Sequence, residues 1–424
     1  MLIEFSVSNF LSFREKQTFS MVATPKLGKR ENVFKPDVKG EKLPDLLKVA
    51  AIYGPNASGK SNLIKALELI QQISSRQPSA QALPLPVTPF RFDPHLVHEP
   101  SRIELHFVYA GQRYEFELAA TSERIMQERL VAFPMGKETE LYERRYSATG
   151  DEYNFGDRLE GGDDLHETWR KLTGSQTLFI AQAVANSSEK LKQLREPLKW
   201  LQNGISIVGE ADMRGLAKAS QNVAKSMPEF AEAISLFLRE IDVPVTNIRF
   251  DPIDDSTLRS LEEGTALKNN AVSNLQSIGP KFSKTTLTHK TALGEALFDF
   301  QEESRGTQNL IGFWLPWWLK GFSLDNLHRT LIVDELDSSL HPKIVASLVE
   351  KHLKLEEPTQ LLFTTHDTHL MDTKLLRRDQ FWLTERDMNG ATQLRCIHDF
   401  KGRESEDVEK RYYEGRYRGL PFLR

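Results

Sequence analysis

The chain has 424 residues, 39% of them hydrophobic and 27% charged, and a formal net charge of -4 at pH 7. This length predicts roughly two or three lobes, and the charge balance provides no overall attraction to nucleic acid. A single cysteine, Cys396, excludes an internal disulfide and a four-cysteine zinc site, and we interpret it as an ordinary strand residue. No apolar run is long enough for a membrane helix, and Glu4 is untypical of a signal peptide, so we expect a cytoplasmic protein without a membrane partner.

A phosphate-binding loop is indicated near the N-terminus. An apolar run at residues 49–53 precedes the letters GPNASGKS at residues 54–61, and a helix-like segment follows at residues 62–67. In this setting glycines let backbone N–H groups surround phosphate oxygens, whereas elsewhere the same letters would be a plain turn before a helix. The lysine would reach the β- and γ-phosphates, and the serine after it would bind Mg²⁺. The predicted nucleotide contacts are Gly54, Pro55, Asn56, Ala57, Ser58, Gly59, Lys60, Ser61 and Asn62.

The middle of the chain changes from strand-like to helix-like patterns. Apolar residues alternate at 103–109 and 114–118 around a turn at 111–112, which predicts an antiparallel hairpin, and residues 150–167 are rich in Gly and Asp and predict an exposed loop. Residues 168–241 have helical spacing, which we interpret as helix-packing faces because Pro197 interrupts the pattern and a long coiled coil needs several unbroken heptads. Residues 251–280 predict a mobile loop, and two strands are expected at 284–288 and 296–300.

A second anion site is indicated where the next helical segment begins. Ser304 and Gly306 form a turn before residues 307–318, and backbone N–H groups at such a turn can bind an anion. The simpler alternative is an N-cap. Because the turn lacks a phosphate-loop lysine, we expect it to complete the phosphate site of a second copy. The tryptophan-rich run at residues 314–318 favours core packing over stacking on nucleic acid.

Acidic residues follow a buried strand in the C-terminal part. Residues 330–333 are apolar and end at Asp334 and Glu335, which we predict to bind the metal and to act as the general base. Alone, the pair would be a solvated strand end, but the phosphate loop favours the catalytic interpretation. A further strand at residues 360–365 ends at His366, predicted to contact the γ-phosphate. His366 and His369 have a metal-like spacing without a third ligand, so zinc is not expected.

These elements resemble the ABC-type ATPases, in particular the branch that contains the chromosome-maintenance and double-strand-break-repair ATPases. Residues 3–13 resemble the opening strand of that branch, residues 334–342 the Walker B and D-loop run, His366 the switch histidine, and Ser304 and Gly306 the signature. Two positions depart from the pattern, since Arg305 replaces a usual glycine and His341 replaces the D-loop aspartate. The resemblance implies an α/β P-loop NTPase fold, namely an ABC-type head with a flanking antiparallel β-sheet and a short helical insertion.

A narrower resemblance is to bacterial ATPases with an AAA-type core domain, similar to the AbiLi, RloA and PtuA components of phage-defence systems. It includes residues 89–92, 334–342 and 409–421. It implies ATP and Mg²⁺ as cofactors, a homodimer or higher homo-oligomer joined through ATP between its heads, and a sensor or scaffold role in abortive infection. No Toprim-like or HNH-like pattern follows His366, so we expect the effector, a nuclease or toxin, to be a separate protein. The alternative is a RecF-like DNA-binding repair ATPase, which leaves nucleic acid open as a partner.

The predicted organisation has three segments. They are an N-terminal ATPase lobe at 1–167, a helical insertion at 168–280 and a C-terminal ATPase lobe at 281–424. Gln127 is a candidate for the Q-loop glutamine, and Ser12 and Arg14 are candidates for base contacts, while the preference for ATP over GTP is implied by the resemblance alone. The mixed-charge run at residues 401–418, with three tyrosines, is either a solvated face or a surface for a partner.

Overall fold

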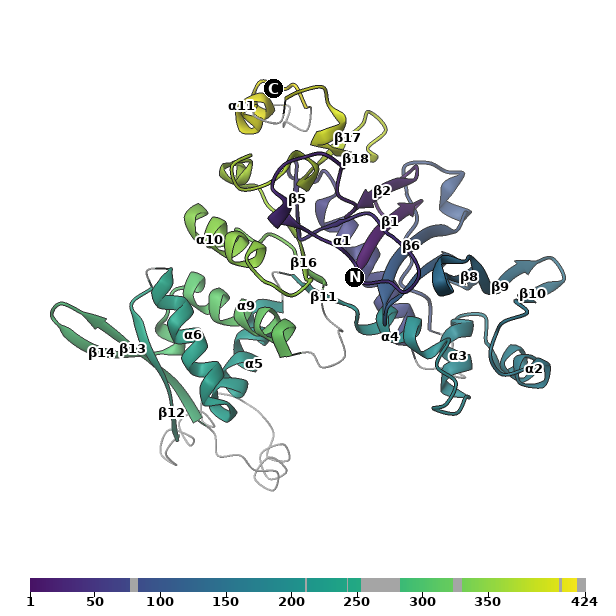
Figure 1. The fold of residues 1–424 in the computed structure, drawn as a ribbon, viewed down its shortest axis with the longest axis horizontal. Coiled ribbons are helices and arrows are strands. Elements are labelled where there is room, and N and C mark those ends of the chain that lie inside the picture. The colour runs from purple at the N-terminus through teal and green to yellow at the C-terminus, as the bar shows by residue number, and fades with distance from the viewer. Residues whose placement is uncertain are drawn as a thin grey trace. The chain divides into compact units, whose positions relative to one another are not determined.

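The computed structural model describes residues 1–76, 83–209, 212–241, 243–252, 283–322, 330–403 and 406–417. The chain forms two compact units, Met1–Glu210 with Leu319–Arg424, and Ala211–Trp318 (Figure 1). These units divide the chain at other positions than the three predicted segments, whose boundaries remain a prediction. Two predicted features lie outside the described residues, namely the mobile loop from residue 253 onward and residues 418–421 of the C-terminal run.

A six-stranded, mostly parallel sheet forms the centre of the first unit. Its order is β11-β15-β16-β5-β17-β18, with the bounds β5 Val49–Tyr53, β11 Ile205–Val208, β15 Thr330–Val333, β16 Gln360–Thr364, β17 Phe381–Arg386 and β18 Thr392–Cys396. Every residue of β5, β15 and β16 is buried, as apolar runs in the middle of a parallel sheet require. Parallel strands end at one edge, so the segments that follow β5, β15 and β16 meet there, with β16 in the middle. The three predicted strands are confirmed.

Strand β11 lies in a stretch that the sequence predicts to be helical. It pairs in parallel with β15, from Ile205 opposite Thr330 to Val208 opposite Val333. The prediction was wrong here because a four-residue apolar run carries no period that distinguishes a strand from a helix. The flanking helices are as expected, with α4 at Arg195–Asn203 before the strand and α5 at Met213–Ser226 after it.

Helices are anchored to the central sheet by side chains that bond to backbone groups. Helix α1, Lys60–Ser74, follows β5, and its Gln71 side chain donates to the carbonyl of Ile205 in β11 at 2.6 Å. Helix α10, Pro342–Leu353, contains the fully buried His352, whose Nε2 lies 3.1 Å from the carbonyl oxygen of Lys48. These bonds fix the helices that begin at the phosphate loop and after the acidic pair.

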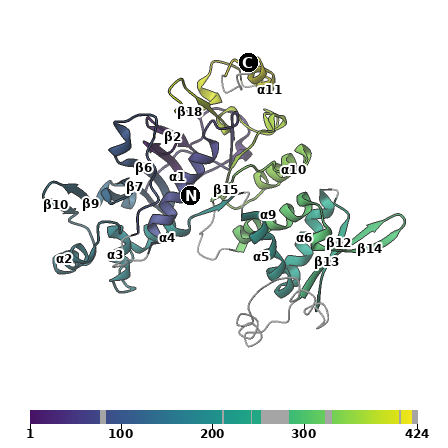
Figure 2. The same ribbon diagram turned by 180° about the vertical axis from the view of Figure 1, so that it is seen from behind.

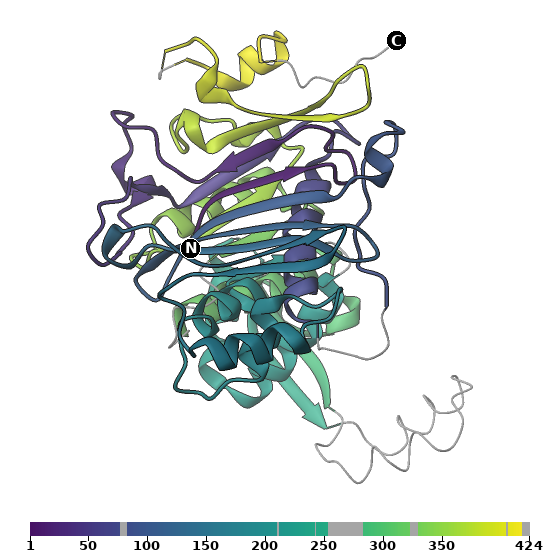
Figure 3. The same ribbon diagram turned by 90° about the vertical axis from the view of Figure 1, so that its right-hand side faces the viewer.

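The first unit also contains a seven-stranded antiparallel sheet (Figure 3), whose buried residues belong to the same hydrophobic core as those of the central sheet. Its order is β10-β9-β8-β7-β6-β1-β2, with the bounds β1 Leu2–Ser8, β2 Gln17–Ser20, β6 Ser101–Tyr109, β7 Gln112–Ala120, β8 Ile125–Ala132, β9 Thr139–Ser147 and β10 Gly150–Phe155. The predicted hairpin is β6 and β7, which pair from Ser101 opposite Ala120 to Tyr109 opposite Gln112. The sheets are therefore those of the predicted fold class, which is α/β with a flanking antiparallel sheet.

The exposed loop predicted at residues 150–167 is wrong. Residues 150–155 form the edge strand β10, and helix α2 begins at Asp163 and ends at Leu172. Gly150, Gly161 and Gly162 have positive φ angles, and the two aspartates at 163 and 164 lie in the first turn of α2. Glycine and aspartate are thus enriched here because they start and end elements, where turns and helix N-termini favour them.

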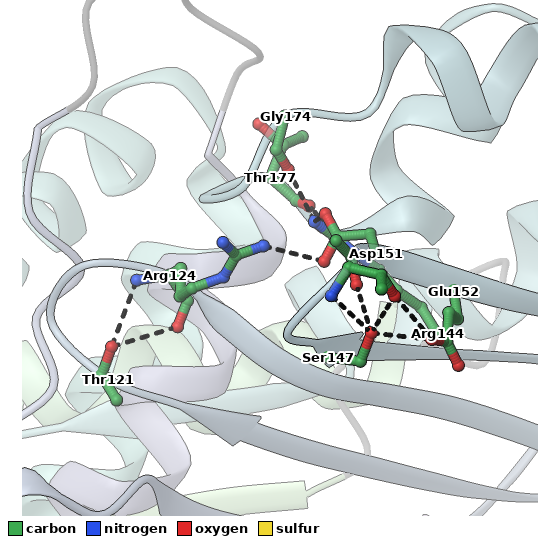
Figure 4. A network of polar contacts seen from close by, with 10 residues as sticks. Thr121, Arg124, Arg144, Ser147, Asp151, Glu152, Gly174 and Thr177 are labelled. Carbon is green, nitrogen blue, oxygen red and sulfur yellow. Dashed lines mark hydrogen bonds and ion pairs between the residues drawn. The ribbon is translucent and has the colours of Figure 1, made fainter.

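Buried charges join this antiparallel sheet to helix α3, Phe179–Ala185, and to the segment before it, where Figure 4 shows Arg144 bonded to Gly174 and Thr177. The Arg144 side chain is fully buried and donates to Asp151 at 2.8 Å and to the carbonyls of Thr177 and Gly174. Next to it the buried Glu128 accepts bonds from the Tyr142 hydroxyl and from the first two N–H groups of α3. Burial raises the pKa of Glu128.

The second unit combines helices with a small antiparallel sheet (Figure 2). Besides α5 it contains α6 Pro228–Glu240, β12 Val245–Pro252, β13 Ser283–Thr291, β14 Gly294–Asp299 and α9 Arg305–Phe322 as far as Trp318. Trp314 stacks on Phe237 with ring centroids 4.4 Å apart, and Trp318 meets Phe230 edge-on at 4.8 Å. The tryptophan-rich run therefore packs within the unit, as the sequence predicts.

Two short strands and one short helix complete the β-strands and α-helices of the described ranges. They are β3 Val33–Phe34, β4 Leu46–Leu47 and, near the C-terminus, α11 Val408–Tyr413. Cys396 is buried at the end of β18, in agreement with its interpretation as a strand residue. Of the helices in the described ranges, none combines the length and the apolar character that a membrane crossing requires.

Candidate functional site

The phosphate loop has a backbone that two of its glycines make possible. Gly54 and Gly59 have φ angles of 151° and 107°. A Cβ atom at Gly54 would lie 2.4 Å from the carbonyl oxygen of Thr384, and one at Gly59 would lie 2.1 Å from the Thr392 hydroxyl oxygen. Both positions therefore need glycine for conformation and for space. Helix α1 begins at Lys60, directly after the loop, so its first N–H groups lie at the site.

Lys60 lies folded across the loop. Its ammonium group donates to the carbonyl of Gly54 at 2.9 Å and to that of Pro55 at 3.3 Å, and the residue is 6% exposed. Burial lowers the pKa of Lys60, and the nearby carboxylates of Glu335, Asp334 and Asp337 raise it in part. A phosphate would offer this buried cation a charged partner instead of two carbonyls.

Hydroxyl groups support the loop from the side of the β17–β18 hairpin. Ser58 Oγ lies 2.5 Å from the Thr384 hydroxyl oxygen. The Thr392 hydroxyl donates to the carbonyl of Ser58 at 2.8 Å and lies 2.7 Å from Ser12 Oγ. Asn62 also donates to Ser12 Oγ, at 2.8 Å. The loop is therefore held in shape by residues far away in the sequence.

The residues predicted to contact the nucleotide base, and the candidate Q-loop glutamine, form other hydrogen bonds in this structure. Ser12 Oγ takes the bond from Asn62, and Arg14 pairs with Asp93 through two bonds of 2.8 and 3.1 Å. Gln127 lies in β8 of the antiparallel sheet and donates to Glu143 at 3.0 Å. Their roles at the nucleotide remain predictions.

The acidic pair follows β15 at the same sheet edge as the phosphate loop. The N–H of Asp334 donates to the carbonyl of Val208 in β11, so the residue still belongs to the sheet. Glu335 turns away with a φ angle of 55°, which is uncommon for a residue with a Cβ atom. Both residues contact the hydroxyl of Thr364 at the end of β16. Sequence analysis missed Thr364, whose only signal was a hydroxyl at the end of a buried apolar run.

The switch segment follows β16. His366 is exposed, and its backbone N–H donates to Asp337 at 3.2 Å. Two residues on, the Thr368 hydroxyl donates to Glu409 at 2.8 Å and lies 2.8 Å from the Tyr413 hydroxyl oxygen. Helix α11 is therefore bonded to the segment that carries His366. Asp367 accepts a bond from His369 at 2.8 Å, which raises the pKa of that histidine.

A cavity of about 1240 Å³ opens between the start of the phosphate loop, His366, the β17–β18 hairpin and α11. Its lining combines aromatic, cationic and acidic side chains, so it is not simply an apolar pocket. The residues that line it are Tyr53, Gly54, Pro55, Asn56, Thr365, His366, Thr368, Glu385, Arg386, Asp387, Met388, Gln393, Arg395, Tyr412, Tyr413 and Gly415.

The predicted signature residues lie in the second unit, at the start of α9. Ser304 and Arg305 are exposed, and Ser304 Oγ accepts the N–H of Thr307 at 3.1 Å, which is an N-cap. The simpler alternative is therefore present, and a contact of Ser304 and Gly306 with phosphate remains a prediction. His341, in place of the D-loop aspartate, caps α10 by accepting the N–H of Lys343 at 3.2 Å.

The residues at the sheet edge fit Mg²⁺ bound together with a nucleotide. Ser61 lies in the first turn of α1 and Asp334 directly follows β15, so the two residues provide one hydroxyl and one carboxylate. Within the described ranges, no three or more His, Cys, Asp or Glu side chains gather so that they could hold a metal by themselves. Mg²⁺ does not need such a cage, because it binds through one or two protein oxygens, phosphates and water.

Comparisons with known proteins show what the chain is similar to. A family model described as "AAA domain, putative AbiEii toxin, Type IV TA system" matches residues 49–372, which include the phosphate loop, the acidic pair and His366. The chain is similar to an SMC head domain from Thermotoga maritima, with 16% identity, a TM-score of 0.39 and coverage of 93% of this chain and 98% of that one. It is also similar to an SmcHead bound to the C-winged helix domain of ScpA, with 12% identity, a TM-score of 0.43 and coverage of 97% and 99%. A comparison with curated proteins found no match.

Proposed function

The chain belongs to the AAA-domain family that matches residues 49–372, and we propose that it binds and hydrolyses ATP, pairs head to head on ATP, and serves as the sensor or scaffold of an anti-phage system. The observation that carries the ATPase part is the meeting of three strand ends at one edge. There the buried Lys60 lies among the charges of Asp334, Glu335 and Asp337. Phosphoryl transfer to water requires a cation that binds phosphate, a carboxylate that binds the metal and a carboxylate that activates the water.

Each residue then has one role. Lys60 and the N–H groups of the loop bind the β- and γ-phosphates, and Ser61 and Asp334 hold Mg²⁺, which neutralises phosphate charge when bound. Glu335 takes the proton of the attacking water, and His366 contacts the γ-phosphate. The exposed position of His366 at the strand end is compatible with this contact.

Pairing of two copies is proposed because the signature turn carries no lysine of its own. Ser304 is exposed at the start of α9, where backbone N–H groups and the helix dipole favour an anion. In the proposed dimer, Ser304 and Gly306 of each copy close on the γ-phosphate held by the other copy. ATP thus bridges the two heads, and its hydrolysis lets the heads separate.

A separate effector is proposed because the late acidic residues serve structural bonds. Asp379 is buried and pairs with Arg377 through bonds of 2.7 and 2.9 Å, and Glu385 pairs with Arg395 at 3.4 Å. Asp387 accepts the N–H groups of Asn389 and Ala391 in the turn between β17 and β18. Because each of these carboxylates is engaged in such bonds, we do not assign them to a nuclease metal site. The family description, which refers to a toxin–antitoxin system, supports a defence role.

The test of the proposed function is Glu335→Gln, which keeps the shape of the side chain but removes the base. We expect phosphate release to fall at least about 1,000-fold, and light scattering to find a dimer only with Mg-ATP. Glu350→Gln is the matched control, because Glu350 is an exposed acid on α10 that pairs with Lys354. Unchanged turnover in Glu335→Gln would reject Glu335 as the base, and a mass that ATP does not change would reject ATP-dependent pairing.

A further inference from the structure

Thr364 touches both members of the acidic pair. It is the last residue of β16 and is fully buried between β5 and β15. Its hydroxyl donates to Asp334 Oδ1 at 2.6 Å and accepts the N–H of Glu335 at 2.7 Å. Its carbonyl accepts the N–H of Leu336 at 3.1 Å. One residue of β16 therefore holds three consecutive residues after β15.

A buried hydroxyl needs partners, so the bonds alone do not demonstrate a role. Thr330 provides the comparison within the same sheet. It is also buried, at the start of β15, and its hydroxyl donates to the side chain of Gln360 at 3.0 Å, at the opposite end of the strands. Thr364 differs from Thr330 in its partners, which are Asp334, predicted to bind the metal, and Glu335, predicted to act as the general base.

The bond to Glu335 acts on a strained residue. A φ angle of 55° is disfavoured for glutamate and persists only where the surroundings hold it. The Thr364 hydroxyl holds the N–H of Glu335, and the Thr364 carbonyl holds the next N–H. Together they fix the turn through which the chain leaves the direction of β15, and hence the point from which the Glu335 side chain starts.

The bond to Asp334 acts on the orientation of a carboxylate. It occupies Oδ1 and fixes the rotation of the group. Removing a residue that hydrogen-bonds to a metal ligand and fixes its orientation usually lowers metal affinity or activity about 10- to 100-fold. The carboxylates of Asp334 and Glu335 are near enough to Lys60 to raise its pKa. Thr364 therefore orients a carboxylate that lies next to the phosphate loop.

We propose that Thr364 is a positioning residue of the ATPase site, which directs Asp334 towards the metal and holds Glu335 in its left-handed conformation. The inference rests on the proposed function. It requires that Thr364 act through its hydroxyl and not through its methyl group.

Two pairs of variants separate the hydroxyl from the volume of the side chain. Thr364→Val keeps the volume and loses the hydroxyl, and Thr364→Ser and Thr364→Ala differ only in the hydroxyl. Thr330→Val is the matched control, because it removes a buried hydroxyl from the same sheet away from the acidic pair. Turnover is measured as phosphate release, and nucleotide binding is measured with a fluorescent ATP analogue with and without Mg²⁺.

We expect Thr364→Val and Thr364→Ala to lower kcat about 10- to 100-fold, while Thr364→Ser and Thr330→Val stay within about threefold of the original protein. Binding without Mg²⁺ should be unchanged, because the phosphate loop is intact, and the gain in affinity on adding Mg²⁺ should shrink in Thr364→Val and Thr364→Ala only. Equal kcat in the Ser and Ala variants, or in the two Val variants, would overturn the inference. If Thr364→Val does not fold, the Ser and Ala pair decides alone.

Failure of the proposed function is a distinct result. If the unaltered protein releases no phosphate from ATP, hydrolysis is rejected, and the binding measurement still tests Thr364. A gain in affinity with Mg²⁺ that depends on the Thr364 hydroxyl would then support the positioning of Asp334, and an equal gain in all variants would overturn it.

Discussion

At the scale of single residues, Lys60 shows how the site stores an unfavourable interaction. Lys60 is 6% exposed, its ammonium group is bonded to two uncharged carbonyls, and burial lowers its pKa. Such a cation gains more from a phosphate than an exposed lysine would, because there is less water to displace.

We predict that Lys60→Met weakens ATP binding by about 2–5 kcal/mol, the usual loss when one partner of a buried charge pair is removed. The thermal midpoint of the protein without nucleotide should not fall, because the thioether fills the same space and needs no counter-charge. Calorimetric titration with ATP and a melting curve measure the two effects. A variant that binds ATP normally would contradict the role of Lys60, and Lys65→Met, an exposed lysine of α1, is the control.

At the scale of elements, the phosphate loop depends on a hairpin that follows it by more than three hundred residues. Thr384 and Thr392 of β17 and β18 lie so close to Gly54 and Gly59 that no Cβ atom fits between them. The loop pattern can be predicted from adjacent letters, but this support cannot, since nothing in the sequence marks two threonines as neighbours of the loop. The same reason explains why the contacts of Thr364 were missed. Strand β10 and helix α2 were mistaken for a loop for a local reason, because glycine and aspartate are enriched where these elements begin and end.

We predict opposite effects of two glycine-to-alanine changes. Gly59→Ala should destabilise the protein and reduce ATP binding, because its Cβ would meet the Thr392 hydroxyl at 2.1 Å and its φ angle of 107° is strained for alanine. Gly215→Ala should stabilise by about 0.5–1 kcal/mol, because Gly215 lies inside α5 with nothing within 4 Å of the new methyl group. Urea unfolding with and without ATP compares them. Equal stability of the two variants would contradict the close packing behind the loop.

At the scale of the whole molecule, the residues that the sequence predicts to bind phosphate lie in two parts of the chain, one in each unit. The phosphate loop, the acidic pair and His366 belong to the first unit, and Ser304 and Gly306 belong to the second. The sequence predicts both parts, since each is a short local pattern. It did not predict that β11 joins the sheet of the first unit, because that depends on pairing with β15 about 125 residues later.

The last prediction concerns which copy supplies the signature. Ser304→Asp keeps a good N-cap for α9 but places a negative charge where phosphate is expected, so the variant should fold and lack turnover. Glu335→Gln should also lack turnover. In a mixed dimer, one site combines the intact Glu335 of one copy with the intact Ser304 of the other.

An equimolar mixture of Ser304→Asp and Glu335→Gln should therefore regain about a quarter of the original phosphate release, since half of the dimers are mixed and each has one intact site. The control is a mixture of Lys60→Met and Glu335→Gln, which should stay inactive because both residues serve the same copy's site. If Ser304 acted on the nucleotide of its own copy, neither mixture would recover. Recovery in the first mixture alone would establish that each head completes the site of its partner, so that the ATP-bound pair, and not the single chain, is the active unit.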